Sequence, residues 1–221
     1  MRRWLFLGLL ASLCSGCQAI PSAQPPRKAV IARSTAVVSP RPAVRVCLAD
    51  LGSKHAGFTP LPDQYYGAGC SALGAVRLSE LKSDRASLAL SGLGPMTCPL
   101  ADSFAGWARY GVDRAAQQIL GSPLTKIETM GSYSCRNIAG SSRRSAHATG
   151  NAIDVSGFVL ADGRRITVAG DWADKSPREQ RFFTAIHTSA CKRFGTVLSP
   201  TYNAAHHDHL HLEMSSRTFC K

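Results

Sequence analysis

The sequence lacks a long apolar run in its interior, so no internal segment is expected to cross a membrane. The only candidate run lies at the N-terminus, over residues 4–13, and it is too short to span a bilayer. Charged residues make up only 18% of the chain and hydrophobic residues 44%, which is typical of a globular protein with a buried core. A chain of 221 residues holds one medium domain with appendages, and this length excludes a fusion of two enzymes.

Acidic residues are absent between residues 18 and 45, where prolines and basic residues follow one another. This composition predicts an extended basic linker over residues 17–45. The whole chain carries a net charge of +12, so we expect the linker either to lie against an anionic envelope surface or to act as a solvated spacer. Its basic residues are not interleaved with aromatic residues, so no nucleic acid is expected as a partner.

The N-terminal residues have the features of an export signal. Arg2 and Arg3 precede the apolar run, so residues 1–16 are predicted to be a signal peptide and the protein to be exported. Cys17 follows two small residues, as in a bacterial lipobox, although Cys14 stands where that motif usually has an aliphatic residue. Two outcomes stay open: a periplasmic protein, or an outer-membrane lipoprotein anchored through Cys17. Such a lipid anchor is the only membrane contact that we expect.

Beyond Cys14 and Cys17 of the lipobox-like segment, no Cys-x-x-Cys pair occurs in the sequence, which argues against a zinc knuckle or a thioredoxin-like motif. Six cysteines remain beyond Cys17, at long spacings, and an even number in an exported chain indicates three disulfides, with free thiols as the alternative. Sequence order favours the following pairs, among many possible connectivities: Cys47–Cys70, Cys98–Cys135 and Cys191–Cys220.

The remaining residues, 46–221, form the predicted domain and contain no internal repeat. Apolar residues at spacings of three and four predict a helix from Asp102–Ser103 to Gly121, and a capping box predicts another from Ser176 to Gly195. Strands are expected over residues 124–130, 152–155, 165–168 and 209–214. Because strands and helices do not alternate regularly, we predict an α+β fold in which helices flank a small antiparallel sheet.

The sequence has no G-x-S-x-G elbow and no cysteine in a Cys/His nucleophile pattern, so hydrolysis by an activated side chain is not expected. Histidines gather instead: four of the seven lie between His206 and His211. On a strand, His209 and His211 would share one face of the sheet. Two imidazoles and a third donor would bind a tetrahedral zinc, and a fourth position left to water would make the site catalytic.

Two remote residues are candidates for the third donor. His147 and Asp154 lie seven residues apart, and Gly150 between them offers the turn that would let both reach one metal ion. Adventitious metal binding by the histidines is the alternative, and Asp154 alone could cap a turn or pair with an arginine. Ser145 and Asn151 are expected to shape this loop.

Several motifs in fixed order resemble the bacterial extensin-like C-terminal domain family, over roughly residues 45–221. These motifs are Thr97–Ala101, Gly131–Arg136, His147–Asp154 and Asn203–His211. The pattern from Ser145 to Asp154, followed by His209-x-His211, also resembles the zinc D-Ala-D-Ala carboxypeptidases and murein endopeptidases of the lysostaphin/carboxypeptidase/Hedgehog superfold. The resemblance implies a Hedgehog/D-Ala-D-Ala-peptidase-like fold, here stabilised by disulfides.

The resemblance also implies the roles of site residues. His147, Asp154 and His211 would bind Zn²⁺, and His209 would lie beside the metal as a base or a transition-state stabiliser. Arg136 would hold a carbonyl or carboxylate of the substrate, with a plain surface arginine as the alternative.

The proton-transfer group departs from the pattern of many of these carboxypeptidases. They have a glutamate before the final histidines, whereas this chain has His206, Asp208 and His209 there. The pattern is closer to the histidine-based endopeptidases, so His209, assisted by His206, is the expected base. Asp208 is expected to be a solvated acid.

Together these features predict a zinc-dependent peptidase that hydrolyses peptide bonds of peptidoglycan, in the stem peptide or the cross-link. A non-catalytic envelope or peptidoglycan-binding protein with a structural or vestigial metal site is the alternative. Structural zinc sites are usually rich in cysteine, and here the cysteines are expected in disulfides, which favours the enzyme.

Overall fold

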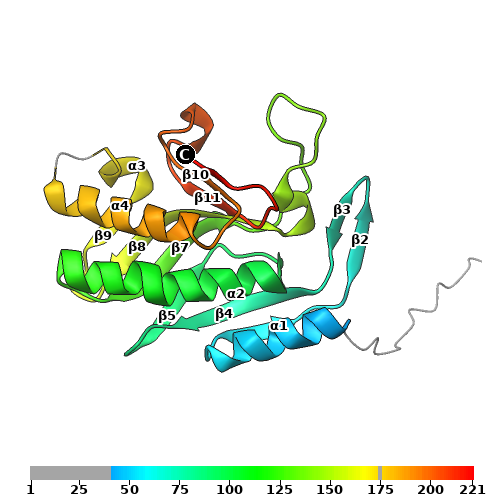
Figure 1. Cartoon of the computed structure of the whole chain (residues 1–221), viewed down its shortest axis with the longest axis horizontal. Coiled ribbons are helices and arrows are strands. Elements are labelled where there is room, and N and C mark those ends of the chain that lie inside the picture. The colour runs from blue at the N-terminus through cyan, green and yellow to red at the C-terminus, as the bar shows by residue number, and fades with distance from the viewer. Residues whose placement is uncertain (1–40, 174–175) are drawn as a thin grey trace, which may run out of the picture. The chain divides into compact units, whose positions relative to one another are not determined.

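The computed structural model describes residues 41–173 and 176–221, within the compact unit Ser39–Lys221 (Figure 1). The predicted signal peptide, Cys17 and most of the predicted linker lie outside the described residues. Residues 42–45, at the end of that linker, belong to a helix. The following helices are present: α1 (Pro42–Ser53), α2 (Cys98–Trp107), α3 (Val168–Asp171) and α4 (Pro177–Cys191). Shorter turns of other helix types follow α2 or lie in loops: η1 (Ala108–Asp113), η2 (Ala116–Leu120), η3 (Ala146–Thr149) and η4 (Ala204–His206).

The described strands form one sheet of ten strands and a separate hairpin. The large sheet runs in the order β1, β4, β5, β7, β8, β11, β10 and β12, with β6 paired to β4 and β9 paired to β8. Its strands are β1 (Gly57–Pro60), β4 (Ala75–Lys82), β5 (Ser87–Ser91), β6 (Met96–Thr97), β7 (Leu124–Gly131), β8 (Ala152–Leu160), β9 (Arg165–Thr167), β10 (Thr196–Leu198), β11 (Leu210–Glu213) and β12 (Phe219–Cys220). The hairpin consists of β2 (Gln64–Gly67) and β3 (Cys70–Ala72).

The mixed α+β class predicted from the sequence is confirmed, but the sheet is larger and less regular than predicted. Most neighbouring strands are antiparallel, whereas β5 pairs with β7 in parallel and β10 pairs with β12 in parallel. Parallel neighbours need a crossover connection, and here α2, η1 and η2 return the chain from β5 to the start of β7. The segment predicted to be one helix therefore forms the crossover connection between the parallel strands β5 and β7.

Proline in the first turn marks the start of α1, α2 and α4, where its missing N–H is not needed. Ser176 is the N-cap residue of α4 as predicted, but its side chain makes no capping hydrogen bond to the helix backbone and contacts the Glu179 carboxylate instead. The helix ends at Cys191, before the predicted Gly195. The predicted start at Asp102–Ser103 was wrong, because α2 begins at Cys98, with Thr97 as its N-cap. Within the described ranges, no helix combines the length and the apolar character needed to cross a membrane.

Helices cover one face of the large sheet, where α4 packs beside η1 and η2, which continue α2 (Figure 1). Buried residues of β8 and β11, among them Val155 and Leu212, share one hydrophobic core with Trp107 of α2 and Phe182 of α4. Alternate residues of a strand project to opposite faces. The side chains between these core residues therefore face the side of the sheet that lies opposite the helices.

Three disulfides join distant parts of the described chain, as the even number of cysteines predicted. The pair Cys191–Cys220 is confirmed, but two predicted pairs were wrong: the bonds are Cys47–Cys98 and Cys70–Cys135. Pairing by sequence order failed because contacts in the fold decide the partner. α1 packs on α2, and β3 of the hairpin lies against η3 at the end of the loop that carries Cys135.

Candidate metal centre

Two of the candidate ligands face each other across neighbouring strands. Asp154 of β8 is directly opposite His211 of β11 in the antiparallel register. Their flanking residues point into the hydrophobic core, so the two polar side chains share the opposite face of the sheet. Side chains directly opposite in an antiparallel pair lie close enough to interact. The His211 Nδ1 atom is 2.9 Å from a carboxylate oxygen of Asp154.

A short turn brings His147 to the same place. Its segment, η3, is capped by Ser145, whose side chain accepts a hydrogen bond from the His147 N–H. Gly150 ends the turn in the left-handed region, with φ of +64°, as expected of a glycine that reverses the chain before β8. Asn151 then donates its side-chain amide to the Met214 carbonyl and so joins this loop to the end of β11. Both Ser145 and Asn151 thus shape the loop.

The three candidate ligands converge at distances that suit one metal ion. His147 Nε2 lies 3.2 Å from His211 Nδ1 and 3.2 Å from the carboxylate of Asp154. Tetrahedral zinc with bonds of about 2.0–2.1 Å holds its ligand atoms about 3.3 Å apart. The donors are buried and consist of two imidazoles and one carboxylate, which is a donor set that zinc accepts. The residues therefore fit a zinc ion.

The electrostatics of the three side chains are tightly linked. Burial alone would raise the pKa of the Asp154 carboxyl, but hydrogen bonds from His147 and His211 hold that pKa well below its usual range. Burial alone would lower the pKa of the His211 ring, but hydrogen bonds to Asp154 and Glu213 raise it to about 9. The carboxylate is thus charged at neutral pH, and a proton and a metal ion would compete for the same ring nitrogen of His211.

Two groups that the sequence reasoning did not identify hold the histidine rings. The Nδ1 atom of His147 lies 3.3 Å from the Ser132 carbonyl, and the Nε2 atom of His211 lies 3.3 Å from a carboxylate oxygen of Glu213. Each contact leaves the other nitrogen of its ring turned toward Asp154, and such partners usually orient the histidine ligands of metals. Glu213 could have been found from the sequence, because it follows His211 by two residues on the same strand face. Ser132 acts through its backbone and leaves no such signal.

Glu213→Gln is expected to weaken zinc affinity about 10- to 100-fold, because the amide supports the His211 ring less well than the carboxylate does. Competition with a chromogenic chelator would measure the affinity. Glu128→Gln is a matched control, since Glu128 lies on β7 of the same sheet and pairs with Arg165 instead of a histidine. Equal zinc affinity in the two variants would show that Glu213 does not support the site.

His209 lies beside the three ligands and is oriented by Asp208. Its Nε2 atom is 3.6 Å from Asp154, and its Nδ1 atom is 2.8 Å from the Asp208 carboxylate. Among the described residues, the ligand atoms of His147, Asp154 and His211 all lie within 4.8 Å of one another, and His209 is not part of this group. The expectation that Asp208 is merely a solvated acid was wrong, because it accepts a hydrogen bond that leaves Nε2 of His209 free to accept a proton.

The other two predicted residues lie at the edge of this group. The His206 ring centre is 5.1 Å from that of His209 and 5.9 Å from that of His211. Burial and these two neighbouring rings lower the pKa of His206 to about 4, so His206 is neutral at neutral pH and a weaker base than an ordinary histidine. Arg136 is exposed on the loop between β7 and η3, and its positive charge also lowers the pKa of His206.

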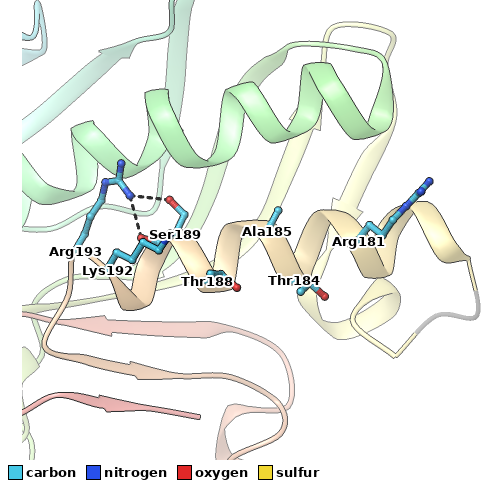
Figure 2. Close-up of a pocket in the computed structure, with 7 residues that line it drawn as sticks. All are labelled: Arg181, Thr184, Ala185, Thr188, Ser189, Lys192 and Arg193. Carbon is cyan, nitrogen blue, oxygen red and sulfur yellow. Dashed lines mark hydrogen bonds between the residues drawn. The ribbon is translucent and has the colours of Figure 1, made fainter.

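Two other features of the described residues are separate from this group. His187 contacts Cys191 and Cys220, but these cysteines are joined in a disulfide and offer no thiolate to a metal. A hollow of about 530 Å³ runs along α4, where small side chains lie between Arg181 at one end and Lys192 and Arg193 at the other (Figure 2). It carries neither a histidine nor a carboxylate.

Comparison with known proteins identifies the family of the chain but adds no closer relative. No curated protein and no solved structure matches the sequence. The model of the family described as "Extensin-like protein C-terminus" matches residues 45–221, which include all helices, strands and histidines named above except the start of α1. The chain therefore belongs to the extensin-like protein C-terminus family.

Proposed function

We propose that the protein is a zinc-dependent peptidase that hydrolyses peptide bonds of bacterial peptidoglycan, in the stem peptide or the cross-link. One observation carries this proposal: His147, Asp154 and His211 converge at separations of 2.9–3.2 Å while His209 lies beside them with an oriented ring. Three protein ligands and an adjacent base are what a catalytic zinc site requires, since a structural site usually has four protein ligands. The Hedgehog/peptidase-like fold and the relation to zinc carboxypeptidases form part of the same proposal.

Each residue of the site has its own role in the proposed hydrolysis. A bound zinc ion supplies a Lewis acid that acidifies water and polarises a carbonyl. His209 accepts a proton from the attacking water through Nε2, while Asp208 holds Nδ1. The carbonyl carbon gains the water oxygen, the C–N bond breaks, and His209 returns the proton to the leaving amine.

In this proposal, Arg136 binds the substrate and His206 offers it a hydrogen bond. Arg136 lies on an exposed loop, from which a guanidinium can bind a carboxylate or a carbonyl oxygen of the peptide. His206 is neutral and adjacent to His209, so it can donate or accept a hydrogen bond without adding charge to the site.

The proposed substrate implies export to the envelope. The signal-like residues 1–16 and the lipobox-like Cys17 support a periplasmic or outer-membrane location, and the basic linker supports contact with an anionic envelope surface. Peptidoglycan carries stem carboxylates, so a chain with a net charge of +12 suits it.

Incubating the zinc-loaded protein with purified sacculi tests the proposal directly. Release of muropeptides with cleaved stems or cross-links is expected, and mass spectrometry would also identify the bond. The same protein treated with a chelator and Asp154→Ala are the controls, and both are expected to leave the sacculi intact. If the sacculi remain intact with the zinc-loaded wild type, the proposed peptidase activity would be overturned and a peptidoglycan-binding protein would be favoured.

A further inference from the structure

The hairpin β2–β3 exposes two large aromatic side chains. Tyr65 and Tyr66 are 77% and 52% exposed, and all four residues of β2 are exposed. These two rings are adjacent in the chain, and a contiguous exposed apolar patch can mark a surface that binds a partner. The hairpin pairs with no strand of the large sheet, so its role in the core is small.

The hairpin is fastened to the loop that borders the candidate metal centre. Cys70 of β3 forms a disulfide with Cys135, and Arg144 donates a hydrogen bond of 2.6 Å to the Ala68 carbonyl in the hairpin turn. Figure 1 shows the hairpin and this loop beside each other. A disulfide and a hydrogen bond hold the two segments together, so the protein would lose little conformational entropy when a ligand binds both.

Tyr66 meets this loop through an aromatic contact. Its ring centre lies 5.3 Å from that of Tyr133, in a tilted arrangement that is typical of stabilising aromatic pairs. Tyr133 stands between Ser132 and Ser134, and both of these neighbours form hydrogen bonds to His147: Ser132 through its carbonyl and Ser134 through its N–H. The aromatic pair is therefore connected to a candidate zinc ligand by single residues on either side.

The Tyr133 hydroxyl adds a second observation. It is buried and makes no hydrogen bond to any residue within the described ranges. A buried hydroxyl without a hydrogen-bond partner is destabilising. A ligand that displaces the cover of this hydroxyl and forms a hydrogen bond with it would offset that cost.

The charge around the aromatic pair favours an anionic ligand. Arg136, Arg143 and Arg144 are exposed on the adjoining loop, and the sequence has no acidic residue between Glu128 and Asp154. Peptidoglycan combines anionic peptide stems with a neutral sugar backbone whose rings have apolar C–H faces. Tyrosine rings bind such amphipathic rings well, because they offer a flat apolar face and a polar hydroxyl at low entropic cost.

We infer that Tyr66 and Tyr133 form a sugar-binding site for the glycan strand of peptidoglycan, placed so that the attached peptide stem reaches the zinc centre. This inference rests on the proposed function, because it assigns the substrate class of that same site. The neighbouring arginines would contact the carboxylates of the stem, and the tyrosines would contact the sugar.

Binding measurements with the full chain test the inference. The probes are a soluble disaccharide-peptide dimer released from peptidoglycan and the same cross-linked peptide without sugars. Tyr66→Ala is expected to weaken binding of the sugar-bearing probe about 3- to 10-fold, which is the effect of one lost aromatic contact. Binding of the sugar-free peptide is expected to stay within about twofold.

Tyr65→Ala is the matched control. Tyr65 is the neighbouring residue on the same strand and is more exposed, but among the described residues the ring contact of Tyr133 is with Tyr66 and not with Tyr65. It is expected to bind both probes as the wild type does, and Tyr66→Phe is expected to keep most of the affinity. Equal melting temperatures of the two alanine variants would exclude a folding defect. Weak binding by Tyr66→Phe would show that the Tyr66 hydroxyl, and not stacking on the ring, accounts for the affinity.

The binding results separate failure of this inference from failure of the proposed function. Equal losses for both probes, or no loss for either, would overturn the sugar site even where the protein cleaves peptidoglycan. A loss confined to the sugar-bearing probe in a protein that cleaves nothing would support the sugar site and reject the peptidase.

Discussion

His211→Ala is expected to lose both zinc and activity, whereas His209→Ala is expected to keep zinc and lose only activity. His211 offers a ring nitrogen at 2.9 Å from Asp154 and 3.2 Å from His147, so its removal takes away one of three ligands. His209 lies outside that group, and loss of a positioned base lowers turnover about 10²- to 10⁴-fold. Zinc content by mass spectrometry of the intact protein and muropeptide release would be measured on the same preparations.

His207→Ala serves as the control for these two variants. His207 lies in the same histidine cluster, but it is exposed: its Nδ1 atom donates a hydrogen bond to the Ala204 carbonyl, and its Nε2 atom lies 3.9 Å from the Asp208 carboxylate. Zinc content and activity close to wild type are expected. Equal zinc content in His211→Ala, His209→Ala and wild type would mean that the ligands are assigned wrongly.

Replacing both Cys70 and Cys135 by serine is expected to reduce the free energy of unfolding by about 4 kcal/mol and to weaken binding to sacculi. The disulfide spans 65 residues, and a cross-link of that length restricts the unfolded chain by about this amount. It also anchors the loop that carries Arg136 and Tyr133 to the hairpin. Denaturant unfolding and co-sedimentation with purified sacculi would measure the two effects.

The disulfide between Cys47 and Cys98 offers the comparison. It spans 51 residues, so its removal is expected to cost nearly the same stability, but it joins α1 to α2 and does not hold the loop of Arg136. We therefore expect Cys47→Ser with Cys98→Ser to bind sacculi like the wild type under conditions where both double variants are folded. Weakened binding in both would indicate a general effect of instability.

Much of the candidate site could be predicted because its donors are encoded locally. The histidine spacing predicted a strand face for His211, residues 152–155 were predicted to be the strand that carries Asp154, and Gly150 predicted the turn that brings His147 to them. These features depend on residues close in sequence. The role of Asp208 became clear only from the structure, because whether a carboxylate meets a ring or the solvent depends on side-chain direction. Glu213 was overlooked, although it follows His211 on the same strand face.

Long-range contacts account for most of the errors in the fold. Cysteine spacing does not reveal that α1 packs on α2 or that the hairpin meets the loop after β7, and so two disulfides were paired wrongly. The parallel pairing of β5 with β7 was missed for a similar reason, since the helical crossover was not recognised as a connection between neighbours. The start of α2 was missed because Pro99 in its first turn was given no weight against Asp102.

Backbone pairing places Asp154 and His211 opposite each other whether or not an ion is present. Small zinc fingers fold only when they bind metal, but here the coordinating geometry is inherited from a hydrophobic sheet that is stable for other reasons. Preorganisation of this kind lets an empty protein capture its ion without first refolding. The metal-free protein is therefore expected to be well folded before any ion binds.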